Sequence, residues 1–131
     1  MKQTIQFKTS MFDVSKERES PINPIYGISL LAWLKSELAG KVEISEPDAE
    51  DWGWYSELEF EGNNYLIGAC AYFEEGGNPN EEIEWVFQVD KRRTFKERLF
   101  GKNKMSVSDS CFVFFKTLLE ENPNFNEVQV A

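Results

Sequence analysis

Histidine is absent from the 131 residues of this chain, and cysteine occurs only twice, as Cys70 and Cys111. The absence of histidine excludes Ser-His-Asp and Cys-His catalysis, general base chemistry by imidazole and every zinc site with a histidine ligand. The two cysteines form no CxxC pair and lie on different expected elements, so we expect buried thiols rather than a disulfide or a nucleophile. We therefore expect no metal and no cofactor.

The chain also lacks a long hydrophobic run. Its first residues, MKQTIQFKTSMFDV, contain no apolar stretch of signal-peptide length, and no segment approaches the ~20 apolar residues that span a bilayer. We therefore expect a cytoplasmic protein that does not associate with membranes. An aromatic content of 15% supplies large side chains for a core, and we expect a single domain over residues 1–131.

The spacing of apolar residues predicts two main helices. Leucines at 30, 31, 34 and 38 recur at helical spacing and are followed by Gly40. A second helix is expected after Ser108, which we predict as its N-cap, with Cys111, Phe115, Leu118 and Leu119 on its apolar side and Pro123 beyond its end. A short helix is expected at residues 95–100.

Alternation of apolar and polar residues predicts strands at 4–12, 41–45, 54–60, 64–73, 82–89 and 126–130. Turn residues at 61–64 and 74–80 make the middle three an antiparallel meander, with Trp85 and Phe87 facing inward. We predict an α+β fold in one domain: a largely antiparallel sheet of four to six strands with the two main helices packed on one face.

Positive charge is missing from the middle of the chain. Between Val42 and Asp90 there are 14 acidic residues and no lysine or arginine, whereas residues 91–104 carry seven basic residues and one acid. The acidic region is either a solvated face or a surface that attracts a basic protein. The segment Lys91 to Lys104 either balances this charge or binds nucleic acid by phosphate contact and base stacking, and the net charge of −9 disfavours nucleic acid.

The hexamer EDWGWY, residues 50–55, is the most unusual stretch. In an extended chain Trp52 and Trp54 point to the same side, so we expect either two core indoles or an exposed aromatic patch with a charged rim. Gly53 between them allows a bulge or a close approach of another backbone. The candidate partner-binding residues are Asp48, Glu50, Asp51, Trp52, Trp54, Glu57 and Glu59.

A resemblance is carried by residues 40–72, GKVEISEPDAEDWGWYSELEFEGNNYLIGACAY. This stretch resembles the middle of a group of small bacterial proteins, in which a helix ending in Gly leads through a short strand to an acidic EDWGW motif and a hairpin. That group has no assigned function, so the resemblance implies no activity. In general form, the chain is also similar to the small, acidic α+β immunity proteins with which bacteria neutralise toxins.

Together these features favour a non-catalytic bacterial protein-interaction domain over an enzyme. We expect it to bind a macromolecular partner, a protein with a basic surface, through its acidic region, and inhibition of the immunity type is one specific form. The alternative is an enzyme or small-ligand-binding protein that uses carboxylates around Asp51 and Glu57. An enzyme should gather two or more carboxylates with raised pKa values in a concave pocket.

Overall fold

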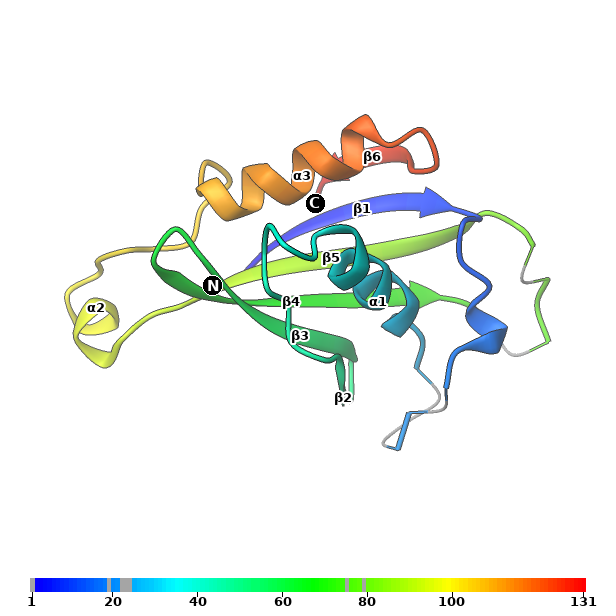
Figure 1. Ribbon diagram of the computed structural model, residues 1–131, viewed down its shortest axis with the longest axis horizontal. Helices are drawn as coiled ribbons and strands as arrows, with labels where there is room; N and C mark the ends of the chain where they lie inside the picture. The colour runs from blue at the N-terminus through cyan, green and yellow to red at the C-terminus, as the bar shows by residue number, and fades with distance from the viewer. Residues whose placement is uncertain (1, 19, 22–24, 75, 79) are drawn as a thin grey trace.

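The computed structural model describes residues 2–18, 20–21, 25–74, 76–78 and 80–131 (Figure 1). Within these residues, one antiparallel sheet has six strands in the order β2-β3-β4-β5-β1-β6. The elements, in chain order, are β1 (Lys2–Thr9), η1 (Val14–Lys16), α1 (Ile28–Glu37), β2 (Asp48–Glu50), β3 (Gly53–Phe60), β4 (Asn63–Tyr72), β5 (Ile83–Arg92), α2 (Phe95–Leu99), α3 (Ser110–Glu121) and β6 (Asn126–Val130).

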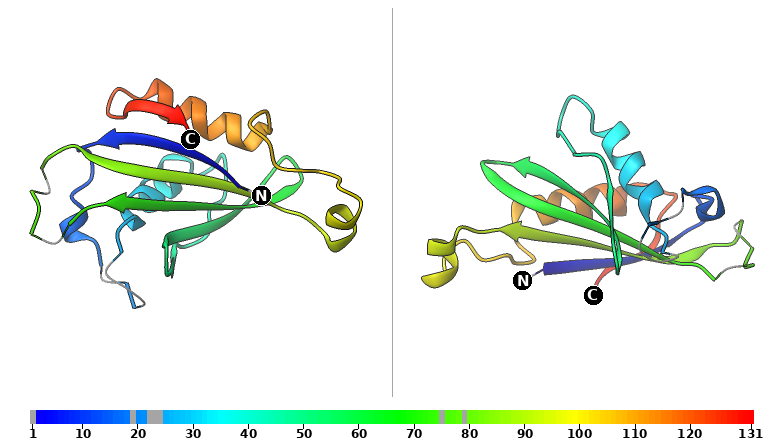
Figure 2. Two further views of the ribbon diagram at one scale, coloured as in Figure 1. Left: turned by 180° about the vertical axis from the view of Figure 1, so that it is seen from behind. Right: turned by 90° about the horizontal axis from the view of Figure 1, so that it is seen from below.

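Helices α1 and α3 lie over the same face of the sheet, and no helix of the described chain covers the opposite face (Figure 2). We call these the helix face and the open face. The predicted α+β fold, with two main helices on one face of an antiparallel sheet, is confirmed. The meander of β3, β4 and β5 is confirmed as well, although residues 75 and 79 of its predicted second turn lie outside the described residues.

The strands assign their side chains to the two faces by strict alternation. On β5, Trp85, Phe87 and Val89 are fully buried on the helix face, as predicted, and the rings of Phe87 and Phe115 of α3 lie 5.3 Å apart. The residues between them, Val86 and Gln88, point to the open face and are only partly buried. One face of the sheet therefore forms the core, and the other meets solvent.

Helix α1 begins without a side-chain cap of its own, because its N-cap residue is Gly27. The carboxylate of Glu17 takes that role from a distant part of the chain: it accepts hydrogen bonds from the backbone N–H groups of Gly27, at 2.8 Å, and Ser29, at 3.0 Å. The Ser29 hydroxyl also donates to it. Satisfying these free N–H groups fixes where α1 starts against the sheet.

Two local predictions are wrong. The strand expected at 41–45 is reduced to a single bridge between Ile44 and Leu58, and the strand that pairs with β3 is β2, inside the acidic connection. Pro47 separates the two pairings, since it has no N–H to donate to a ladder. The N-cap of α3 is Asp109 rather than Ser108, because the Asp109 carboxylate accepts from two backbone N–H groups at the helix start.

Candidate functional site on the open face of the sheet

The EDWGWY hexamer forms a tight hairpin between β2 and β3. Glu50 pairs with Gly53, so Asp51 and Trp52 form the turn between them. Trp52 is therefore not extended, and the expectation that Trp52 and Trp54 point to the same side is wrong. Trp54 is 1% exposed on the helix face, whereas Trp52 is 38% exposed.

Trp54 is a core residue and does not reach the protein surface. Its indole N–H donates to the carbonyl oxygen of Ile25 at 3.4 Å, and the guanidinium carbon of Arg18 lies 5.1 Å from the centre of its ring. Such a cation over an indole is an attractive contact. Trp54 thus holds the connection before α1 onto the sheet and is removed from the set of residues that can contact a partner directly.

Trp52 folds back onto the open face and lies against Gly68 of β4. A Cβ at position 68 would lie 2.5 Å from Cη2 of Trp52 and 2.9 Å from Cγ of Gln88. The missing side chain thus leaves the space that the indole occupies. Gly53 serves the close approach predicted for it, because a Cβ there would lie 2.5 Å from the carbonyl oxygen of Ala69.

Carboxylates from two strands lie on the same face of the sheet as this indole. Asp48 pairs directly with Tyr55, and directly paired residues share a face of the sheet. The charge of Asp48 is the main cause that raises the pKa of Tyr55, followed by burial and by the charges of Glu50 and Glu57. Four of the predicted carboxylates therefore share the open face, and we name the following set the open-face patch: Asp48, Glu50, Trp52, Tyr55, Glu57 and Glu59.

Tyr55 is the member of this patch that the sequence reasoning missed. It could have been found from its spacing: Tyr55, Glu57 and Glu59 occupy alternate positions of β3, so all three lie on one face of the strand. Asp51, in contrast, lies in the exposed turn rather than on the sheet. Glu57 and Gly53 are separated by roughly 13 Å of strand, and Asp51 lies beyond Gly53, so Asp51 and Glu57 do not form a carboxylate pair.

The basic segment divides between several roles. Arg92 donates to Glu57 at 2.8 Å, in an ion pair of which both side chains are more than half exposed, so it balances one end of the open-face patch. Arg93 donates to the carbonyl oxygen of Lys102 at 3.0 Å and closes a loop. Part of this segment therefore balances charge, and the remainder extends away from the sheet with α2.

Lys91 belongs to a buried polar cluster under the start of α3. Its ammonium lies 2.6 Å from Oδ2 of Asp109, and their side chains are 8% and 4% exposed. The hydroxyl of Tyr65 donates to the same oxygen at 3.0 Å, while Oδ1 of Asp109 accepts from the backbone N–H of Cys111. Every oxygen of this carboxylate is thus satisfied, as a buried charge requires.

This cluster shifts the pKa values of its members. Burial by itself would raise the pKa of Asp109, but hydrogen bonds from Lys91, Tyr65 and the N–H of Phe112 together lower it. Burial and then the neighbouring carboxylate raise the pKa of Tyr65, and burial raises that of Cys111 to about 12. Cys111 is therefore a neutral thiol, buried as expected. Cys70 is also a free thiol, but it is only half-buried because its position on β4 faces the open side of the sheet, so the expectation that it is buried is wrong.

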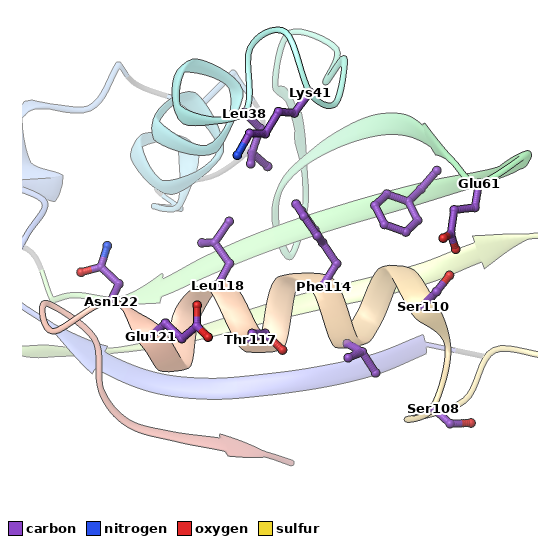
Figure 3. Close-up of a pocket in the computed structure, with 12 residues that line it drawn as sticks. Leu38, Lys41, Glu61, Ser108, Ser110, Phe114, Thr117, Leu118, Glu121 and Asn122 are labelled. Atoms are coloured by element: carbon purple, nitrogen blue, oxygen red, sulfur yellow. The ribbon is translucent and has the colours of Figure 1, made fainter.

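A concave region lies on the helix face, between α1 and α3 (Figure 3). This groove has a volume of about 730 Å³ and apolar walls that include Leu38, Phe60, Phe114 and Leu118. Phe114 and Leu118 point from α3 toward the end of α1, where Leu38 and Lys41 lie (Figure 3). No sequence pattern indicated it, because its walls come from elements far apart in the chain.

Across the described residues, no three histidine, cysteine or acidic side chains are grouped so that they could hold a metal ion. In the same part of the chain, no helix is long and apolar enough to cross a membrane. The chain matches no protein-family model, no curated protein and no solved structure.

Proposed function

We propose that this chain is a non-catalytic bacterial protein-interaction domain that binds a protein with a basic surface through the open-face patch. The observation that carries the proposal is the position of Trp52: a partly exposed indole lies on a sheet face that no described helix covers, and carboxylates of β2 and β3 lie on the same face. An aromatic anchor with a charged rim is a typical arrangement at protein interfaces.

The two parts of the patch contribute differently to binding. Trp52 supplies a large and rigid contact surface that loses little conformational entropy on binding, because its ring already lies on Gly68. Asp48, Glu50 and Glu59 are exposed and form no salt bridge among the described residues, so their charge is available to a cationic partner. Such charges mainly accelerate and orient the encounter.

Inhibition of the immunity type is the specific form that we propose for this binding. A toxin that acts on nucleic acid presents a basic surface to its substrate, and an acidic sheet face complements that surface. The class-level likeness to immunity proteins points in the same direction. In this reading the domain performs no chemistry and acts by covering the partner's cationic site.

The alternative, an enzyme that uses carboxylates, receives less support from the geometry. Asp51 and Glu57 lie apart along the hairpin, and Glu57 is paired with Arg92. Among the described carboxylates with a displaced pKa, Glu97 and Asp109 are both lowered, whereas a general acid at neutral pH needs a raised pKa. The chain therefore supports binding better than acid–base catalysis.

The test is a binding measurement with matched charge variants. The partner is captured from the native host with the tagged chain, purified, and titrated against Trp52→Ala, against the double variant Asp48→Asn/Glu50→Gln, and against Glu37→Gln/Glu43→Gln as a control of equal charge. We expect Trp52→Ala to raise Kd about 10-fold to 100-fold. The Asp48/Glu50 variant should slow association and reduce its salt dependence.

Three outcomes bear on the proposal. A control variant that binds like the wild type, together with weaker binding by both patch variants, supports it. A captured partner whose Kd is unchanged by both patch variants overturns it, because that partner would then contact another surface. Turnover of a substrate by the purified chain, lost on substitution of Glu57, would favour the enzyme instead.

A further inference from the structure

The segment that contains α2 projects from one end of the molecule, beyond the end of the sheet (Figure 1). We name residues 93–104 the basic arm. Phe95, Leu99 and Phe100 of this arm are 73%, 65% and 62% exposed, and α2 has no buried residue. Phe95 and Leu99, four positions apart, lie on one side of α2, and Phe100 is its C-cap residue. We call these three exposed side chains the apolar tip. Exposed apolar clusters of this kind mark interaction sites.

The basic arm is held in one shape rather than left as a loose loop. The Thr94 side chain accepts from the N–H of Glu97, and the Glu97 carboxylate accepts from the N–H of Thr94, which completes a capping box. The bond from Arg93 to the Lys102 carbonyl closes the arm, and Asn103 links it to Lys91 and Asn63 of the sheet. A preformed tip loses little entropy when it binds.

The charge of the arm is strongly positive, with five basic residues and one acidic residue. Its one carboxylate, Glu97, is engaged by the capping box. Four exposed basic residues of the arm form no salt bridge in the part of the chain that the structure describes: Lys96, Arg98, Lys102 and Lys104. The surface that binds the arm should therefore be apolar at its centre and negatively charged at its edges.

The groove between α1 and α3 has this combination. Its walls are apolar, and its edges carry two carboxylates, Glu61 and Glu121, against one ammonium, Lys41. At about 730 Å³ it falls within the range of sites that enclose a drug-sized molecule, ~300–1,000 Å³, so it has room for several large side chains. The open-face patch offers carboxylates as well, but there the space above Gly68 is already filled by Trp52.

We propose that the basic arm of one copy of this chain binds in the α1–α3 groove of a second copy. The apolar tip matches the apolar walls, and the cationic flanks match Glu61 and Glu121. In a single chain, α2 lies beyond the end of the sheet and apart from α1 (Figure 1), so the match is made between copies. If each copy both gives and receives an arm, the contact closes as a symmetric dimer, the commonest arrangement of identical chains.

The experiment is sedimentation velocity of the full chain over a range of concentrations. The arm variant is Leu99→Ser/Phe100→Ser, and the groove variant is Val113→Lys, at a groove residue that is 44% exposed. The matched controls are Tyr72→Ser and Val130→Lys, which change exposed side chains elsewhere. Circular dichroism shows that each variant is folded.

We expect the wild type to dimerise, the controls to dimerise equally, and each of the two interface variants to raise the dimer Kd about 30-fold or more. Mixing the arm variant with the groove variant distinguishes an arm–groove contact from other contacts. The arm variant keeps an intact groove and the groove variant keeps an intact arm, so an equimolar mixture should regain a mixed dimer held by one contact. Added salt should weaken the dimer, because the flanking charges are exposed.

Several results would overturn the proposal. These are a wild type that stays monomeric at every concentration, a dimer that survives either interface variant, and a mixture that remains monomeric. A dimer that is lost in the arm variant and kept in the groove variant would indicate contact between two arms. A chain that does not self-associate but binds nucleic acid through the arm would show that nucleic acid is the partner of the arm. Trp52→Ala should leave the dimer unchanged, so the result is independent of the function proposed for the open-face patch.

Discussion

The indole of Trp52 lies directly on Gly68, with Cη2 at only 2.5 Å from the position that a Cβ of residue 68 would take. Two elements are joined by this contact, since Trp52 comes from the β2–β3 turn and Gly68 from the middle of β4. The absence of one side chain on β4 therefore determines where the aromatic centre of the open-face patch sits.

Substitution of that glycine should move the indole without unfolding the protein. In Gly68→Ala the new methyl group displaces the ring, which is free to swing outward because it is already 38% exposed. We expect more efficient quenching of tryptophan fluorescence by acrylamide and a change in unfolding free energy within about 1.5 kcal/mol. The same substitution in a Trp52→Phe background serves as the control and should leave quenching unchanged. Equal quenching of Gly68→Ala and wild type would contradict the contact.

The two tryptophans of EDWGWY should differ sharply in their contribution to stability. Trp54→Ala removes a fully buried indole together with its contact to Arg18, and we expect a loss of about 3–5 kcal/mol. Trp52→Ala removes a ring on an open face and should cost about 1 kcal/mol or less. Urea denaturation followed by circular dichroism measures both. Similar losses for the two variants would show that the hairpin does not place them on opposite faces.

The buried ion pair between Asp109 and Lys91 should make stability depend on pH in the acid range. The pKa of Asp109 is lower in the folded chain than its ordinary value of 3.8, so the folded state binds its proton less tightly than the unfolded state. The resulting stabilisation is fully present well above pH 3.8 and is lost as the pH falls through the lower, folded pKa.

Asp109→Asn tests this linkage, because asparagine does not ionise. The variant should be less stable than the wild type near neutral pH, by about 3–5 kcal/mol, because the charge of Lys91 is left buried without its partner. Its unfolding free energy should fall less steeply than that of the wild type between pH 5 and pH 2. The matched control, Glu37→Gln, removes an exposed carboxylate of α1 and should keep the slope of the wild type. Parallel curves for Asp109→Asn and wild type would refute the role of this carboxylate.

Most of the fold could be predicted because apolar periodicity is a local property. The three strands of the meander, the two main helices and the final edge strand follow from residues that are neighbours in the chain. The strand predicted at 41–45 failed because Val42 and Ile44 are buried under tertiary contacts without forming a ladder, and burial of alternate residues looks the same in either case. Apolar periodicity shows which residues are buried, but it does not show whether a neighbouring strand is available to pair with them.

The candidate site was predicted in part for the same reason. Alternation along one strand predicts that Glu57 and Glu59 share a face, whereas Asp48 and Glu50 are candidates only because they crowd one acidic connection. The pairing of β2 with β3 places all four on the open face. Trp54 was misplaced with Trp52 because alternation ends where the turn begins, and the two-residue turn could not be located before the pairing of Glu50 with Gly53 was known. Lys91 and Asp109 were not connected at all, as 18 positions separate them in the sequence.

The sequence by itself determined the class of fold, the segregation of charge and the exclusion of histidine chemistry, because composition and short-range periodicity do not depend on how the chain closes. Only the tertiary structure decided that Trp52 is a surface residue and Trp54 a core residue, that Asp109 neutralises Lys91, and that a groove opens between α1 and α3. These features depend on contacts between distant segments, whose geometry is set by the register of the sheet and the packing of the helices on it.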